Sequence, residues 1–263
     1  MSHPTSQHEF HIGAGECRRR LVDGERGRWR LPDGPLEVAG EARVGRLLIA
    51  HGAGAGQDSI FLQRLRGALA GQGVQTLAIE FAYLQRMRRE GRRRPPPGVG
   101  SLVEEMAAWR DLLSHPGLPP LWLGGKSLGG RVASLLAARD GAAGLALCGY
   151  PFHPPRRPER LRLDHWPELA CPTLVVQGTR DPFGAREEVA GYALPAVVHL
   201  HWLEDGDHDW KPRRASGLTQ AALIDQGAAA IAAFIGAPSL GEAGRKGMNP
   251  RRKRASAPGH EKR

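Results

Sequence analysis

The chain has 263 residues, of which 41% are hydrophobic and only 6% aromatic, together with 35 Gly and 21 Pro. This length allows one large domain with a buried core, and this composition is typical of a loop-rich α/β protein rather than of a helical bundle. No apolar run approaches the roughly 18 residues of a membrane span, and the N-terminal residues lack the apolar stretch of a secretory signal, so we expect a cytoplasmic protein without a membrane partner.

Residues 1–45 form an N-terminal segment in which Gly27–Leu31 and Leu36–Ala39 are candidate antiparallel strands that lead into the sheet. Over residues 46–236, short apolar runs alternate with helical patterns, which predicts one doubly wound α/β domain. The predicted strands are Arg46–Ala50, Val74–Ile79, Leu121–Leu123, Gly144–Cys148, Thr173–Gln177 and Val197–Leu203. Most are uninterrupted apolar runs, as in strands covered on both faces, so we expect a mostly parallel sheet.

Four helices are predicted between these strands from their apolar spacing. They are Ser59–Ala70, Leu102–Leu113, Leu128–Ala138 and Thr219–Ile235, with Ser101 and Thr219 as N-terminal caps. The connections Phe81–Gly100 and Tyr150–Ala170 are expected to be long loops, which in compact domains are usually functional or mobile.

The basic character of the chain is concentrated at its C-terminal end. The net charge is +10, and residues 239–263 alone hold eight Lys or Arg against two Glu. These residues are rich in Gly, Pro, Ser and Ala and show no apolar periodicity, so we expect residues 237–263 to form a disordered basic tail. The tail has no interleaved aromatic side chains, which argues against a nucleic-acid partner; any such contact would run through this tail.

The stretch LWLGGKSLGGRVASLL, residues 121–136, contains two overlapping motifs. A phosphate-binding loop ends in Gly-Lys-Ser, but its first glycine would fall at Pro120, and residues 121–124 belong to a strand instead of a wide cradle. A dinucleotide site is a second alternative, because Gly52–Gly56 follows one strand and Glu80 ends the next. That motif lacks its third glycine, since Gln57 occupies the position.

The other motif, Gly-Lys-Ser-Leu-Gly, lies between a strand and a helix, as a nucleophile elbow requires. In such folds an acid follows a later strand and a histidine follows the last one, and Asp181 and His208 occupy these places. We therefore predict Ser127 as the nucleophile, His208 as its base and Asp181 as the acid that orients the imidazole. The less favoured acids are neighbours of the histidine: Asp205, Asp207 and Asp209.

An oxyanion hole needs two backbone N–H groups, for which Leu128 and Ala53 are the candidates and Gly54 the alternate. His51 is expected to stabilise the turn rather than to act as a base. Loops at the carboxyl ends of the strands should form the pocket. Its candidate residues are Tyr83, Lys126, Phe152, His153, Arg180, Phe183 and Trp210. Cations in four such loops suggest the hypothesis that the substrate carries a carboxylate or a phosphate.

Neither a metal nor an organic cofactor is expected. Cys17, Cys148 and Cys171 are far apart and not at metal-ligand spacing, which indicates reduced thiols. His199 and His201 share one face of a strand but have no third ligand at a suitable spacing, so we expect ordinary strand residues.

The segments LLIAHGAGAG, GGKSLGGRVAS, GYPFHPP, QGTRDPFG and LEDGDHDW together resemble the bacterial α/β-hydrolase-like proteins related to dienelactone hydrolases and grouped with the eukaryotic KANL/Tex proteins. The resemblance runs from about residue 46 to Ile235. It implies an α/β-hydrolase fold with Ser127, Asp181 and His208 as the triad, and we expect no large cap domain. It does not imply a known substrate.

The leading hypothesis is a serine hydrolase that cleaves a small ester or thioester through an acyl-enzyme intermediate. The resemblance includes eukaryotic proteins that act as scaffolds instead of enzymes. A hydrolase fold without catalytic activity that serves as an interaction module is therefore the first alternative. A dinucleotide-binding protein is the second. The oligomeric state is open at this stage.

Overall fold

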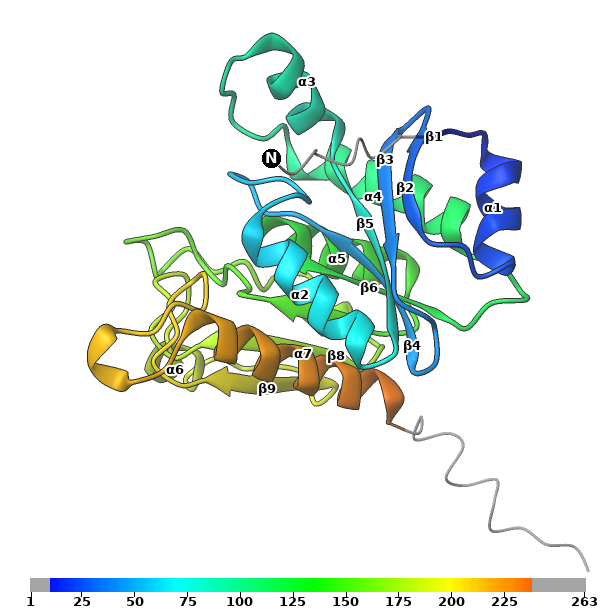
Figure 1. The fold of residues 1–263 in the computed structure, drawn as a ribbon. Helices are drawn as coiled ribbons and strands as arrows, with labels where there is room; N and C mark the ends of the chain where they lie inside the picture. Colours follow the sequence, from blue (N-terminus) through cyan, green and yellow to red (C-terminus); the bar gives the residue numbers. More distant parts are fainter. Residues whose placement is uncertain (1–9, 238–263) are drawn as a thin grey trace, which may run out of the picture.

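Nine strands form one mixed sheet in the computed structural model, which describes residues 10–237 (Figure 1). The strands are β1 (Phe10–His11), β2 (Gly27–Leu31), β3 (Gly34–Ala39), β4 (Gly45–Ala50), β5 (Val74–Ile79), β6 (Leu121–Lys126), β7 (Leu145–Cys148), β8 (Thr173–Gly178) and β9 (Val198–Leu203). Their order across the sheet is β1-β2-β3-β5-β4-β6-β7-β8-β9. Strands β4 to β9 are mutually parallel, so their carboxyl ends meet at one edge of the sheet.

Helices cover both faces of this sheet, as the apolar strands require. They are α1 (Ala14–Val22), α2 (Ile60–Gly71), α3 (Ala82–Glu90), α4 (Val99–Leu113), α5 (Leu128–Asp140), α6 (Arg186–Val189) and α7 (Gln220–Gly236), with 3-10 turns η1 (Trp166–Glu168) and η2 (Arg214–Ser216). One apolar layer is formed with α2 and α7, and the other with α1, α4 and α5. Helix α3 projects beyond the sheet (Figure 1).

The predicted strands agree with the observed ones, although β6 continues to Lys126. Strands β2 and β3 pair antiparallel, as their apolar runs predict, and β3 joins the parallel strands through β5. Thr219 caps α7, since its Oγ1 accepts a hydrogen bond from the Ala222 N–H at 3.1 Å. Hydrophobic runs flanked by turn residues were sufficient signals for all of these elements.

Two predictions about residues 81–113 are wrong. The expected loop Phe81–Gly100 contains α3 and the start of α4. Leu84 is the one buried residue of α3, and the short, arginine-rich segment leads into a run of prolines, so it resembles a loop in sequence. Ser101 is not a cap, because α4 already begins at Val99, after the run of prolines.

All three cysteines are buried free thiols. Burial raises the pKa of Cys17 to about 11 and that of Cys148 to about 12. No helix within residues 10–237 is long and apolar enough to cross a membrane. The predicted basic tail, from residue 238 onward, lies outside the described residues.

Candidate active site

Ser127 lies at a sharp turn between β6 and α5. Its backbone has φ of 52° and ψ of −110°, a strained conformation for a residue with a side chain. A Cβ atom on Gly125 would lie 2.6 Å from the Ala50 carbonyl oxygen, and one on Gly129 would also collide with that carbonyl. The two glycines therefore allow β4 to approach the turn closely, and the serine side chain is left at the carboxyl edge of the sheet.

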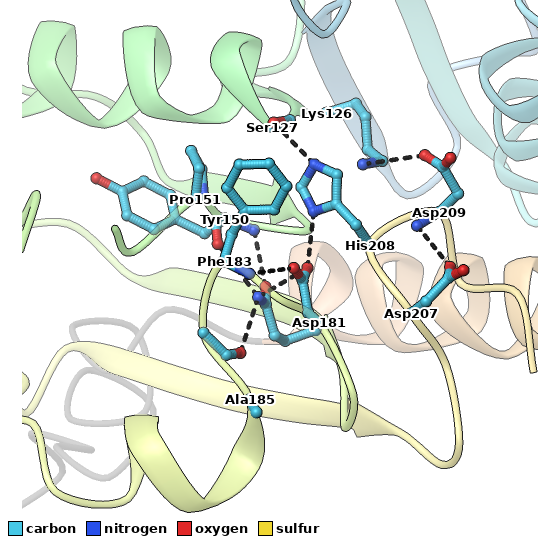
Figure 2. Close-up of polar contacts among 12 residues, drawn as sticks. Lys126, Ser127, Tyr150, Pro151, Asp181, Phe183, Ala185, Asp207, His208 and Asp209 are labelled. Carbon is cyan, nitrogen blue, oxygen red and sulfur yellow. Dashed lines mark hydrogen bonds and ion pairs between the residues drawn. The ribbon is translucent and has the colours of Figure 1, made fainter. Parts of the chain in front are cut away.

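His208 lies between Ser127 and Asp181 (Figure 2). Its Nε2 accepts the hydrogen bond of the Ser127 hydroxyl at 2.9 Å, and its Nδ1 donates to Asp181 Oδ2 at 2.8 Å. The Asp181 side chain is fully buried, so this hydrogen bond is shielded from water. The structure thus brings together the three side chains that the sequence placed after β6, β8 and β9.

Gln177, which the sequence analysis missed, holds the carboxylate of Asp181. Its Nε2 donates to Asp181 Oδ2 at 3.0 Å, and its Oε1 accepts from the Tyr150 N–H at 2.7 Å. The Phe183 N–H donates to the other carboxylate oxygen at 2.9 Å. The available signal was a polar residue at the end of an otherwise apolar strand, where a buried amide needs partners.

Two of the three alternative acids, Asp205 and Asp207, bind groups other than the imidazole. Asp205 pairs with Arg180 and Arg213 through its carboxylate. Asp207 Oδ1 accepts from the backbone N–H groups of Asp209 and Lys211, at 2.8 Å and 2.9 Å. Neither carboxylate contacts the imidazole, because each stabilises the loop that carries His208.

Lys126 reaches past the imidazole to Asp209, with 3.5 Å between Nζ and Oδ1 (Figure 2). Its side chain is only 8% exposed, whereas that of Asp209 is 56% exposed. Nζ also lies 5.5 Å from the centroid of the Phe61 ring. Burial lowers the pKa of this lysine. The pair therefore connects the residue before the serine to the residue after the histidine.

The loop after β4 lies opposite the serine, and a buried histidine shapes it. His51 Nδ1 donates to the Gly52 carbonyl at 2.7 Å, and its Nε2 accepts from the Phe81 N–H at 3.1 Å. These bonds fix a neutral ring, and burial lowers the pKa of His51 to about 4. The prediction that His51 stabilises the turn agrees with both hydrogen bonds.

A cavity of about 530 Å³ opens at Ser127 and His208. Its walls are residues 52–55, the start of α2, Lys126, Phe183, the loop after His208, and Gln220. Ala53 and Gly54 line this cavity. Leu128 is the first residue of α5, so its N–H has no acceptor within the helix. The candidate oxyanion donors thus belong to the loop after β4, which lines the cavity, and to the first residue of α5.

Of the seven candidate pocket residues, only Lys126 and Phe183 line this cavity within the described part of the chain. The Phe183 ring packs against the His208 imidazole, tilted by 38° to it, with 4.3 Å between the ring centroids. The assignment of Phe152 and Trp210 to the pocket was wrong, because both are fully buried in the apolar layers. The sequence does not show whether an aromatic side chain at a strand end points into the core or toward the substrate.

The remaining three candidates also have other roles. Arg180 is held by Asp205, with its Nε 2.9 Å from Oδ1. His153 is buried and bonded to the Pro154 carbonyl at 2.9 Å. Tyr83 donates from its hydroxyl to the Ala53 carbonyl at 3.2 Å, so it supports the loop without lining the cavity.

The groups that suggested other ligands are also accounted for. Glu80, the acid of the dinucleotide alternative, is buried and pairs with Arg88 at 2.9 Å. His199 packs near Phe234, with 5.2 Å between the ring centroids. Within residues 10–237, no group of three or more His, Cys, Asp or Glu is arranged to hold a metal ion.

A mostly parallel sheet whose carboxyl edge presents a serine at a strand–helix elbow, an aspartate and then a histidine is the architecture of α/β-hydrolases. Residues 43–236 match the model of the alpha/beta hydrolase domain family, and the chain therefore belongs to this family. The fold prediction is confirmed.

Solved structures with the same fold include a dienelactone hydrolase from Anabaena variabilis, with 20% identity and a TM-score of 0.58 over 78% of this chain and 94% of that one. An alpha-beta serine hydrolase homologue from Coxiella burnetii has 18% identity and a TM-score of 0.55 over 81% and 95%. A lidless serine hydrolase from Xanthomonas campestris has 17% identity and a TM-score of 0.55 over 79% and 94%. The last of these agrees with the expectation of a fold without a large cap.

Proposed function

We propose that the protein is a serine hydrolase that cleaves a small ester or thioester. The observation that carries this proposal is the unbroken hydrogen-bond chain from the Ser127 hydroxyl through His208 to Asp181, at 2.9 Å and 2.8 Å, at the mouth of a cavity. A base in hydrogen-bond contact with a strained serine activates that serine as a nucleophile, which an interaction module does not require.

In the proposed reaction, Ser127 Oγ attacks the acyl carbon while His208 Nε2 takes its proton. The carbonyl oxygen becomes negative, and the N–H groups of Leu128 and Ala53, or of Gly54, stabilise it. His208 then returns the proton to the leaving alcohol or thiol as its bond to the acyl carbon breaks. Water activated by the same imidazole hydrolyses the acyl-enzyme and restores the serine.

The cavity favours a small acyl group. Ile60, Phe61, Leu62 and Phe183 contribute apolar surface, and the volume of about 530 Å³ is within the ordinary range for small-molecule sites. Lys126 and Lys211 are the cations of its wall among the described residues; Lys126 pairs with Asp209 of the same wall, so Lys211 is the cation that supports the hypothesis of an anionic substrate. We also propose that the protein is more closely related to the dienelactone-hydrolase-related KANL/Tex group. The hydrolase domain is proposed to span residues 46–236.

Labelling with a fluorophosphonate probe tests the proposal directly. The wild type should become labelled and should hydrolyse nitrophenyl butyrate, and Ser127→Ala should do neither. Ser101→Ala is the matched control, since Ser101 is an exposed residue of α4. No labelling of the wild type would instead favour the idle interaction module, and equal labelling of Ser127→Ala would show that another residue reacts and would overturn the assignment of Ser127.

A further inference from the structure

A second cavity of about 330 Å³ adjoins the one at Ser127. The two cavities share Gly54, Ala55 and Ser59 in their walls. The second is completed by α3 and the residues that follow it, including Arg92 and Arg93. A groove therefore leads from the serine across the loop after β4 to the end of α3.

The far end of this groove is strongly basic. Residues 86–94 (RMRREGRRR) contain six arginines and one glutamate. Arg86 and Arg94 both pair with Glu90, and Arg88 pairs with Asp58 and Glu80. The other three arginines, Arg89, Arg92 and Arg93, have no carboxylate partner among residues 10–237, and all are exposed.

The loop between the two cavities carries only small side chains at residues 54 and 55. A Cβ atom on Gly54 would meet no atom within 4 Å, and its φ is not in the left-handed region, so neither packing nor backbone geometry requires a glycine there. Gly54 and the small Ala55 therefore place no large side chain between the two cavities. A substrate can therefore extend across Gly54 with one end at Ser127 and the other at Arg92 and Arg93.

Arginine binds phosphate with paired, charge-assisted hydrogen bonds, and unpaired arginines at a groove attract phosphate-bearing molecules at long range. We infer that the substrate is an acyl ester or thioester whose far end carries phosphate groups, which bind at Arg92 and Arg93. This inference rests on the proposed function and gives it a substrate class. A nucleotide-containing thiol carrier and a carrier protein with a phosphorylated pantetheine arm share the required chemistry.

A matched pair of substrates tests this inference. The butyryl thioesters of coenzyme A and of N-acetylcysteamine carry the same reacting bond, but only the first has phosphates. The wild type should prefer the coenzyme A thioester by at least about tenfold in kcat/KM at low ionic strength, and added salt should reduce this preference. Arg92→Gln/Arg93→Gln should lose most of the preference. A butyrylated carrier protein, as a third substrate, distinguishes the two sources of phosphate.

Arg86→Gln/Arg94→Gln is the control, because it removes the same charge from the same segment at residues already paired with Glu90. It should keep the preference. Equal rates on both small thioesters in the wild type, or an undiminished preference in Arg92→Gln/Arg93→Gln, would overturn the inference while leaving the hydrolase proposal intact. If no ester is cleaved, the hydrolase proposal fails, and calorimetric titration of Ser127→Ala with coenzyme A still decides whether phosphates bind at Arg92 and Arg93.

Discussion

At the scale of single residues, the site depends on which of four neighbouring carboxylates serves the histidine. Asp181 alone bonds to the imidazole, and Gln177 and the Phe183 N–H hold it in place. Asp205 pairs with Arg180 and Arg213, Asp207 accepts hydrogen bonds from backbone N–H groups of its own loop, and Asp209 pairs with Lys126. The motif spacing singled out Asp181, which bonds to His208 in the structure, but it contained no information about what fixes the carboxylate.

Asp181→Asn should leave the fold intact and reduce kcat by about 10⁴-fold, because an amide can no longer hold His208 in the tautomer that accepts the serine proton. Asp205→Asn is the comparison, since Asp205 does not contact the imidazole. A reduction in kcat of similar size in both variants, at equal thermal stability, would show that the wrong acid has been assigned.

Lys126 and Asp209 join the two loops that carry the serine and the histidine. We expect Lys126→Met and Asp209→Asn to act on kcat/KM non-additively, with a coupling free energy of about 0.5–1 kcal/mol, since the pair is only partly shielded from water. A double-mutant cycle on nitrophenyl butyrate measures this coupling. Strictly additive effects would mean that the pair does not position the histidine.

At the scale of elements, the elbow works because β4, β6 and α5 approach one another without side chains between them. Apolar runs and the glycine pattern predicted this junction correctly, because a continuous strand and a Gly-x-Ser-x-Gly turn are local signals. Helix α3 was missed for the opposite reason: Leu84 is its one buried residue, Tyr83 is only partly buried against the core, and the rest of the segment is rich in arginine. Its position beside the Gly54 loop is a tertiary feature that no local pattern expresses.

Gly125→Ala should lower the free energy of unfolding by at least about 2 kcal/mol, because the new methyl group would lie 2.6 Å from the Ala50 carbonyl oxygen and force β4 and β6 apart. Gly54→Ala is a suitable control, since its methyl group would meet nothing within 4 Å. Urea unfolding of both variants provides the measurement. A Gly125→Ala protein as stable as Gly54→Ala would contradict the packing of the elbow.

At the scale of the whole molecule, the parallel order from β4 to β9 brings residues 53, 127, 181 and 208 to one edge of the sheet. The mostly parallel sheet and the placement of these residues at the carboxyl ends of strands were predicted from the sequence, whereas the order of the strands across the sheet was not. The pocket wall did not, because the direction of Phe152, Arg180 and Trp210 depends on packing partners distant in the chain. Burial also makes the stability of the whole fold depend on pH through His51.

The pKa of His51 is about 4 in the folded protein and near 6.5 when unfolded, so the folded-state pKa is depressed. The unfolded chain therefore binds a proton first as the pH falls, and stability present above about pH 6.5 is lost toward pH 4. We expect this residue to account for about 2 kcal/mol of the loss between pH 7 and pH 4.5. Urea unfolding at both pH values should show a shallower pH dependence in His51→Asn; an unchanged slope would contradict a neutral buried ring.

The burial of all three cysteines has a practical use. A thiol reagent reacts with the thiolate, and the Cys17 and Cys148 side chains are hidden in the core with their pKa values raised to about 11 and about 12. The thiols of the folded protein should therefore not react with a chromogenic disulfide. Every thiol that such a reagent detects during turnover would come from a cleaved thioester, so the release of coenzyme A can be followed continuously and without a protein background.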